Sequence, residues 1–184
     1  DPQKLWKDAI AQGNRESAKW PYDWVNGVDY PHKDQRTTVS GQLVLTDPLM
    51  PAAKMSRVLV GLAHPAYPGG GGPGGSRQVD WQTDAKHYEF WVLGADNGRF
   101  AIPNVRPGTY TLHAIADGVL GEFTKTDITV QAGKALNLSK LTWTPMRRGK
   151  QLWEVGIPNR TATEFFKGDD YFHDGMPLLY ASLF

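Results

Sequence analysis

The sequence predicts a mainly β chain, in which a small antiparallel β-sandwich lies between an N-terminal helix and an irregular C-terminal extension. Three observations lead to this prediction. Short runs rich in β-branched and aromatic residues recur from residue 37 to residue 145, with Gly, Pro, Asn and Asp between them. The runs do not alternate with helical patterns, as the strands of parallel sheets do. One helical pattern precedes them, at residues 2–19.

The helix expected at residues 2–19 begins at a proline, which suits a first helical position, and ends before Pro21. A short apolar stripe at helical spacing supports it: Leu5, Trp6, Ala9 and Ile10. An irregular tether follows, as far as residue 36, and we expect its aromatic residues to anchor it on a surface: Trp20, Tyr22, Trp24 and Tyr30.

The expected strands begin with an alternating run in which Val39 and Leu43 share one side. In a later run, Phe90 is expected to face the core and Trp91 the opposite side. The runs lie at residues 37–47, 55–63, 86–94, 99–105, 109–116, 126–130 and 135–145.

The glycine-rich segment 67–77 is expected to be a flexible loop. Its glycines do not make it a phosphate-binding loop, because it lacks the Lys-Ser/Thr pair and the following helix that such a loop requires.

Composition excludes several classes of function. With 20 Lys+Arg against 19 Asp+Glu, the net charge of +1 gives no general attraction to nucleic acid or to anionic membranes. The absence of cysteine excludes disulfides and thiolate chemistry. No apolar run reaches the roughly 20 residues of a membrane span. The first residues do not resemble a signal peptide, so we expect a cytoplasmic chain, a mature exported form or a fragment.

The stretch 152–175 is the part of the chain that most resembles an active site. As a pair for glycoside hydrolysis, the candidate carboxylates are Glu154, Glu164, Asp169 and Asp170. As a calcium site, the candidate ligands are Asp169, Asp170, His173 and Asp174, although their spacing is not that of an EF-hand loop. We favour surface solvation for these acids, and we expect no other cofactor. The remaining histidines, His64 among them, do not show metal-ligand spacing.

Several motifs together resemble one family. The segment "RPGTYTL" after the turn "NGRF" looks like a fibronectin-III-like or transthyretin-like sandwich. The order and spacing of further motifs along nearly the whole chain resemble the rhamnogalacturonan lyases of polysaccharide lyase family 4: "WPYDWV", "SGQLVLTDP", "VGLAHP", "WQTDAKHYEFW", "VRPGTYTLHAIADGVLGEF", "LTWTP" and "GKQLWEVGIPNRTATEFFKGD".

This resemblance implies a three-part enzyme of which the chain is a piece. Residues 1–36 look like the helix and tether that come from a preceding catalytic domain, and residues 37–145 look like the middle sandwich. Residues 146–184 look like a linker and the start of a carbohydrate-binding-like domain. The family cleaves the rhamnose–galacturonate backbone of pectin by β-elimination, with catalytic groups in the N-terminal domain. None of those motifs is present, so no residue of this chain is expected to be catalytic.

The resemblance therefore implies a secreted, non-catalytic scaffold between domains, with rhamnogalacturonan I as the substrate of the parent enzyme and no nucleic acid or membrane partner. An alternative is a free-standing sandwich that binds pectin, which predicts exposed coplanar rings. A third possibility, a small enzyme, predicts raised carboxylate pKa values. The residues expected to contact either carbohydrate or a neighbouring domain are Trp81, Trp91, Trp153, Arg160 and Tyr171.

Overall fold

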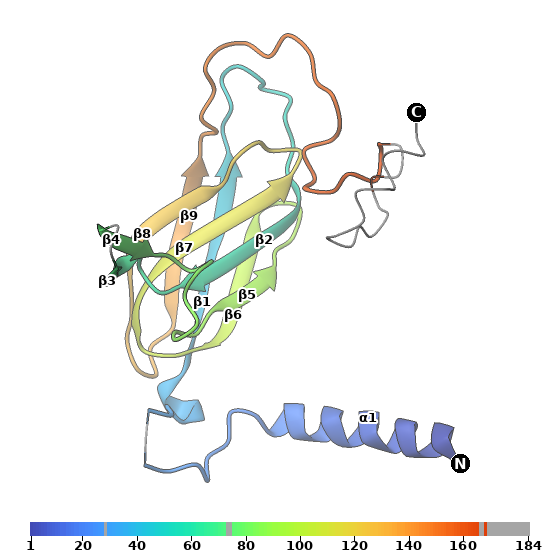
Figure 1. Ribbon diagram of the computed structural model, residues 1–184, viewed down its shortest axis with the longest axis vertical. Coiled ribbons are helices and arrows are strands. Elements are labelled where there is room, and N and C mark those ends of the chain that lie inside the picture. Colours follow the sequence, from blue (N-terminus) through green and yellow to red (C-terminus); the bar gives the residue numbers. More distant parts are fainter. Residues whose placement is uncertain (28, 73–74, 166–167, 169–184) are drawn as a thin grey trace.

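The computed structural model describes residues 1–27, 29–72, 75–165 and 168 (Figure 1). An α-helix, α1 (Pro2–Lys19), and a short 3₁₀ helix (Lys33–Gln35) precede the strands. The strands are β1 (Thr37–Leu45), β2 (Ser56–Ala63), β3 (Tyr67–Gly72), β4 (Gly75–Val79), β5 (Phe90–Leu93), β6 (Arg99–Val105), β7 (Gly108–Asp117), β8 (Phe123–Val130) and β9 (Leu136–Trp143).

Two sheets form the sandwich, as the sequence predicts. One has three strands in the order β6-β1-β9, and the other has four in the order β5-β2-β7-β8. The pairs are antiparallel except β1 with β9, which run parallel. β1 and β9 are the first and last strands of the sandwich, and they run in the same direction. The chain therefore enters the sandwich at one end and leaves it at the other (Figure 1).

The core lies between the two sheets and follows the two-residue period of the strands. On β2, Val58, Val60 and Leu62 are completely buried, whereas Leu59 and Gly61 face outward. From the other sheet, side chains of β1, β6 and β9 meet them, among them Val39, Leu43, Phe100, Ile102 and Trp143. The expectation that Phe90 faces the core is confirmed, because it packs against this cluster.

The glycine-rich segment differs from the expectation of a flexible loop. Residues 67–72 and 75–79 pair as the antiparallel hairpin β3–β4. Glycine carries no signal in a pattern of side chains, yet its backbone N–H and C=O groups form a ladder as other residues do. The sequence pattern therefore predicted the position of this segment but not its pairing.

Helix α1 occupies the predicted residues and is capped by Asp1, whose side chain accepts a hydrogen bond from the backbone N–H of Gln3 at 2.9 Å. The helix buries none of its residues, and its apolar stripe is exposed, with Leu5 and Trp6 at 71% and 70% exposure. No helix in the described ranges combines the length and apolar character needed to cross a membrane.

Candidate functional site

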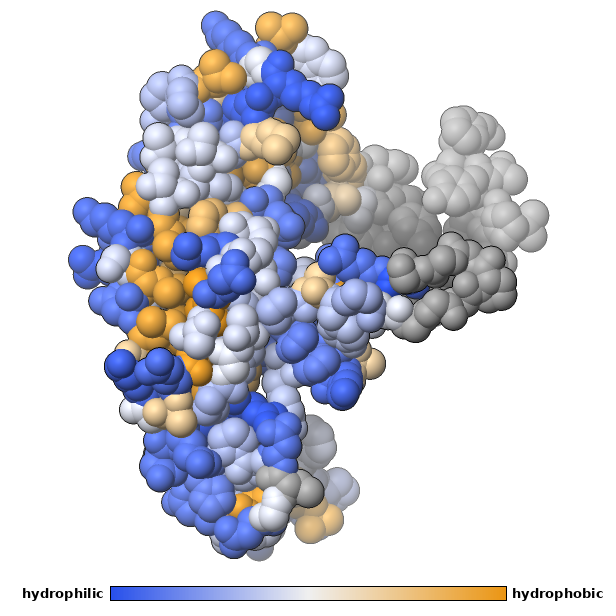
Figure 2. Space-filling model, turned by 90° about the vertical axis from the view of Figure 1, so that its left-hand side faces the viewer, coloured by the Kyte–Doolittle hydropathy of each residue, from blue (hydrophilic) through white to orange (hydrophobic). Residues whose placement is uncertain are grey.

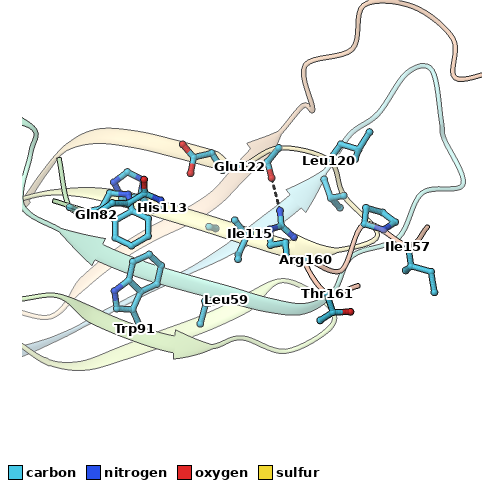
Figure 3. A pocket seen from close by; sticks show the side chains of 15 residues that line it. Leu59, Gln82, Trp91, His113, Ile115, Leu120, Glu122, Ile157, Arg160 and Thr161 are labelled. Atoms are coloured by element: carbon cyan, nitrogen blue, oxygen red, sulfur yellow. Dashed lines mark hydrogen bonds between the residues drawn. The ribbon is translucent and has the colours of Figure 1, made fainter. Parts of the chain in front are cut away.

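A pocket of about 710 Å³ lies on the outer face of the four-stranded sheet (Figure 3). Outward side chains of β2, β5 and β7 line it, because they alternate with the core side chains of the same strands. The loop before β5 borders one end, and the linker after β9 borders the other. We call this pocket the aromatic groove, defined by Leu59, Trp81, Trp91, His113, Ile115 and Arg160.

Gly61 determines how Trp91 lies in the groove. Gly61 on β2 pairs with Trp91 on β5 and with His113 on β7, so these residues form one row across the sheet. A Cβ atom on Gly61 would overlap the six-membered part of the Trp91 indole. The absence of a side chain at this position therefore lets the indole lie across the sheet.

Three aromatic rings cluster at one end of the groove. The ring centroids of Trp81 and Trp91 are 5.1 Å apart with planes at 54°, and Trp81 lies 5.7 Å from His113. The indole N–H of Trp91 donates to Glu89 Oε2 at 2.6 Å. The two indoles thus make the walls of a wedge and not the coplanar platform that the carbohydrate-binding alternative predicts.

His113 adds a polar group to the largely apolar floor. Burial lowers the pKa of His113, which favours the neutral imidazole at neutral pH. Among the described residues, none hydrogen-bonds its buried Nδ1 atom. The floor of the groove therefore contains a buried polar atom that has no hydrogen-bond partner among the described residues.

Arg160 closes the other end of the groove by holding the linker against the sheet. Its guanidinium donates to the carbonyl of Ala116 at 3.0 Å. It also donates to the carbonyl of Gly121 at 2.8 Å, the bond drawn as a dashed line in Figure 3. The backbone N–H of Gly118 also donates to the carbonyl of Pro158 at 3.2 Å. Arg160 is expected from the sequence to contact carbohydrate or a neighbouring domain, whereas these two hydrogen bonds tie the linker to its own sandwich.

Arg147 anchors the first part of the same linker. Its Nε atom donates to Asp47 Oδ2 at 2.5 Å, and the Asp47 side chain is buried while that of Arg147 is 10% exposed. The other oxygen of Asp47 accepts from the backbone N–H groups of Leu49 and Met50, both at 3.1 Å. Burial alone would raise the pKa of Asp47, but the hydrogen bonds from Arg147 and these backbone groups outweigh it, so its pKa lies below the usual value.

This pair makes the stability of the linker anchor depend on pH. Because the pKa of Asp47 is lowered in the folded state, its stabilising effect is complete above the unfolded pKa of about 3.9 and is lost as the pH falls through the folded value. We expect Asp47→Asn to lower the melting temperature at pH 6 and the difference from the parent chain to shrink as the pH falls below about 4. Thermal melts followed by circular dichroism at each pH measure it, and a constant difference would contradict this role.

Arg36 anchors the N-terminal tether at the opposite end of the sandwich. Its side chain is buried and donates to the carbonyls of Pro31 at 2.9 Å and Asn104 at 3.2 Å. The guanidinium also lies over the rings of Trp20 and Tyr30, with distances of 4.8 and 5.3 Å to their centroids. These two rings therefore pack on Arg36 within the tether, whereas Trp24, also expected to anchor it, is 74% exposed.

Arg106 makes a second contact with the tether. It forms an ion pair with the carboxylate of Asp29 and donates to the backbone carbonyl of the same residue at 3.0 Å. Its guanidinium lies 4.3 Å from the centroid of the Tyr88 ring. With Arg36, Arg147 and Arg160, it completes a set that we call the anchoring arginines.

Comparison with known protein families identifies the sandwich. Residues 55–138, from the residue before β2 into β9, match the family model described as "Polysaccharide lyase family 4, domain II". The sandwich is a polysaccharide lyase family 4 domain.

Relatives of this chain carry names that agree with the family. The rhamnogalacturonate lyase B of Emericella nidulans is 38% identical over 81 residues, which cover 44% of this chain and 12% of that protein. The probable rhamnogalacturonate lyase B of Aspergillus flavus is 32% identical and covers 49% of this chain and 13% of that protein. The rhamnogalacturonate lyase of Dickeya dadantii is 30% identical over 169 residues, covering 91% of this chain.

The chain spans about one eighth of the length of the fungal lyases and 25% of the bacterial one. The match to the bacterial lyase extends beyond the sandwich, since 169 aligned residues exceed the stretch from Thr37 to Trp143. The segments that flank the sandwich therefore also have counterparts in that protein.

The residues predicted to make contacts do not all lie together. Trp81, Trp91 and Arg160 share the aromatic groove, whereas Trp153 lies in the linker, 76% exposed, and lines a separate pocket beside Arg147. The predicted contact residue Tyr171 and the calcium candidates lie outside the described residues: Asp169, Asp170, His173 and Asp174.

The two described acids of the expected carboxylate pair are occupied by local hydrogen bonds. Glu154 accepts from Gln151 Nε2 at 2.7 Å, and Glu164 accepts from the backbone N–H of Ile157 at 2.7 Å. The bond from Ile157 lowers the pKa of Glu164. A general acid needs the opposite shift, so Glu164 does not fit that role in a hydrolase.

Sequence reasoning did not single out Arg36, Arg106 or Arg147. A signal was present for the first two, because Arg36 directly precedes β1 and Arg106 directly follows β6. An arginine at the boundary of a buried strand has backbone carbonyls of neighbouring connections within reach. Asp47, the partner of Arg147, follows the first strand of the sandwich, whereas Arg147 follows the last strand. No local sequence pattern relates two residues so far apart in the chain.

Proposed function

We propose that this chain is a non-catalytic region of a rhamnogalacturonan lyase and that it holds the neighbouring domains of that enzyme in fixed relative positions. The parent enzyme would cleave the rhamnose–galacturonate backbone of pectin by β-elimination, using residues outside this chain. One observation carries the proposal: the anchoring arginines bind both flanking segments to the sandwich.

The two anchored segments lie at opposite ends of a stiff body. Because β1 and β9 are parallel neighbours, the tether joins the sandwich where β1 begins, and the linker leaves it where β9 ends (Figure 1). The nine residues of β1 separate these points by about 30 Å at about 3.3 Å per residue. A packed sandwich between them transmits the orientation of one segment to the other.

Both flanks carry large apolar side chains that the chain itself leaves exposed. On α1 these are Leu5, Trp6 and Ile10, and on the linker they are Leu152, Trp153 and Val155. Figure 2 shows a further band of apolar surface along the sandwich, bordered by hydrophilic side chains. Apolar side chains gathered in this way are typical of surfaces that another domain covers, which supports a place between two domains.

Distance measurements between the two flanks test the scaffold. The chain has no cysteine, so nitroxide labels attach only to cysteines introduced at Asp23 in the tether and Thr163 in the linker. We expect double electron–electron resonance to give one narrow distribution of distances between the two labels when the chain carries no other substitution. Arg147→Ala combined with Arg160→Ala is expected to broaden it, since the linker then loses both anchors.

Arg148→Ala is the control, because Arg148 is an exposed arginine of the same linker. Circular dichroism establishes that each variant keeps the sandwich. A distribution that is already broad in the parent chain, or that the double variant leaves unchanged, would contradict a rigid scaffold.

Two assays on the intact chain address the alternatives. Incubation with rhamnogalacturonan I is expected to give no rise in the absorbance of the unsaturated product. Affinity electrophoresis in a pectin gel is expected to show no retardation. Retardation that Trp91→Ala removes would instead assign pectin binding to the aromatic groove. Since the substrate is an extracellular polysaccharide, the proposal also implies that the parent enzyme is secreted.

A further inference from the structure

Two histidines and one aspartate meet beyond the end of β2, away from the aromatic groove. His64 directly follows β2, and Asp84 and His87 belong to the loop that leads into β5. One potential ligand atom from each lies within 4.8 Å of the others. The imidazole rings of His64 and His87 stack, with centroids 3.8 Å apart and planes at 17°.

Hydrogen bonds determine which nitrogen of each neutral ring carries the proton. His64 Nδ1 lies 2.8 Å from the carbonyl oxygen of Pro65, which can only accept. His87 Nδ1 lies 2.7 Å from Asp84 Oδ2, and a carboxylate likewise accepts. Both rings therefore carry their proton on Nδ1, which leaves the lone pair of each Nε2 available to a ligand.

Asp84 is held in place by further donors. Its Oδ1 accepts from the backbone N–H of Lys86 at 2.8 Å and of His87 at 3.3 Å, and from the hydroxyl of Tyr67 at 3.4 Å. The bond from Lys86 is the main reason why the pKa of Asp84 is lowered. A carboxylate fixed in this way orients the His87 ring, as carboxylates commonly do behind histidines that bind zinc.

We propose that His64 and His87 bind a divalent transition-metal ion, with Zn²⁺ as the best fit, through their Nε2 atoms, and that Asp84 positions His87. Two imidazoles favour zinc over calcium, which prefers a shell of oxygen ligands. The two histidines and the neighbouring Lys86 and Tyr88 line a pocket of about 630 Å³, which gives an ion and its remaining water ligands access.

Binding requires one ring to turn. An imidazole binds a metal in its own plane, so two nearly parallel rings 3.8 Å apart do not both point at one ion. The χ2 torsion of histidine has a broad energy profile, so the half-buried His64 can turn and give up its hydrogen bond to Pro65, while Asp84 keeps the ring of His87 in place. The two Nε2 atoms thus reach their binding positions only when the ion is bound.

Calorimetric titration of the whole, chelator-treated chain with zinc sulfate tests the proposal. We expect saturable binding of one ion. His87→Ala and His64→Phe, which keeps an aromatic ring in the stack but no ligand atom, are each expected to abolish it. Asp84→Asn is expected to weaken it by about 10–100-fold, the usual effect of losing the partner of a metal-binding histidine.

His32→Ala is the matched control, because His32 lies in the tether and binds the carbonyl of Val25. It is expected to leave the affinity unchanged, and circular dichroism checks the fold of each variant. As a second readout, excess Zn²⁺ should raise the melting temperature of the parent chain but not that of His64→Phe. Absence of saturable binding, or binding that survives in both histidine variants, would overturn the proposal. Loss of binding only on replacing Asp169, Asp170 and Asp174 would also overturn it, since the ion would then lie elsewhere.

Discussion

Leu112→Ala is expected to lower the free energy of unfolding by about 2–5 kcal/mol. Leu112 lies on β7, is completely buried, and belongs to the cluster that joins the two sheets. Its truncation removes apolar contacts and leaves a cavity that a close-packed sandwich fills only in part. Urea unfolding followed by circular dichroism measures the change through the midpoint at constant slope.

Leu93→Ala is the matched control for this prediction. Leu93 is on β5 of the same sheet but is 72% exposed, and the same truncation there is expected to change stability by no more than about 0.5 kcal/mol. Equal losses at the two positions would mean that the outer face of the sheet is covered in solution, and that the core does not lie between the two sheets as described.

Gly61→Ala is expected to cost about 1–3 kcal/mol of stability and to displace Trp91 from its place in the aromatic groove. The new Cβ atom would overlap the indole ring, so either the ring or the strand must shift. The indole is the more mobile of the two, since it is half-exposed and held by one hydrogen bond to Glu89. Urea unfolding gives the cost, and the tryptophan emission spectrum reports the displacement.

Gly13→Ala separates this effect from the general effect of replacing glycine. Gly13 lies in α1 with open space around it, and its replacement is expected to favour the helix by up to about 1 kcal/mol. The double variant Gly61→Ala with Trp91→Ala should recover much of the loss, because the overlapping ring is then absent. Additive costs in the double variant would show that Trp91 does not lie over Gly61.

Much of the fold was predictable because its signals are local. The alternation in the run from residue 37 placed Val39 and Leu43 on one side, and both are completely buried in the core. The prolines near its two ends delimited α1. The prediction failed at residues 67–79, where glycine contributes backbone pairing without a pattern of side chains. The parallel pairing of β1 with β9 also escaped it, since direction depends on strands that are far apart in the sequence.

The candidate site shows the same division between local and distant information. The aromatic residues Trp81 and Trp91 were expected to make contacts, but a list of contact residues does not say that they share a groove with Arg160. His64 and His87 showed no metal-ligand spacing, because the hairpin β3–β4 lies between them in the chain. Their stacking arises only when β2 and the loop before β5 are brought together by the sheet.

The sequence alone determined the order of the seven strands of the sandwich, the core-facing sides of β1 and β5, and the family resemblance. These properties follow from the periodicity of neighbouring residues and from short motifs. Only the tertiary structure decided which carbonyls the anchoring arginines bind, how the indole of Trp91 lies on Gly61 and which histidines meet. Such contacts join residues that are distant in the chain, and their geometry depends on how strands pair and sheets pack, which local patterns do not specify.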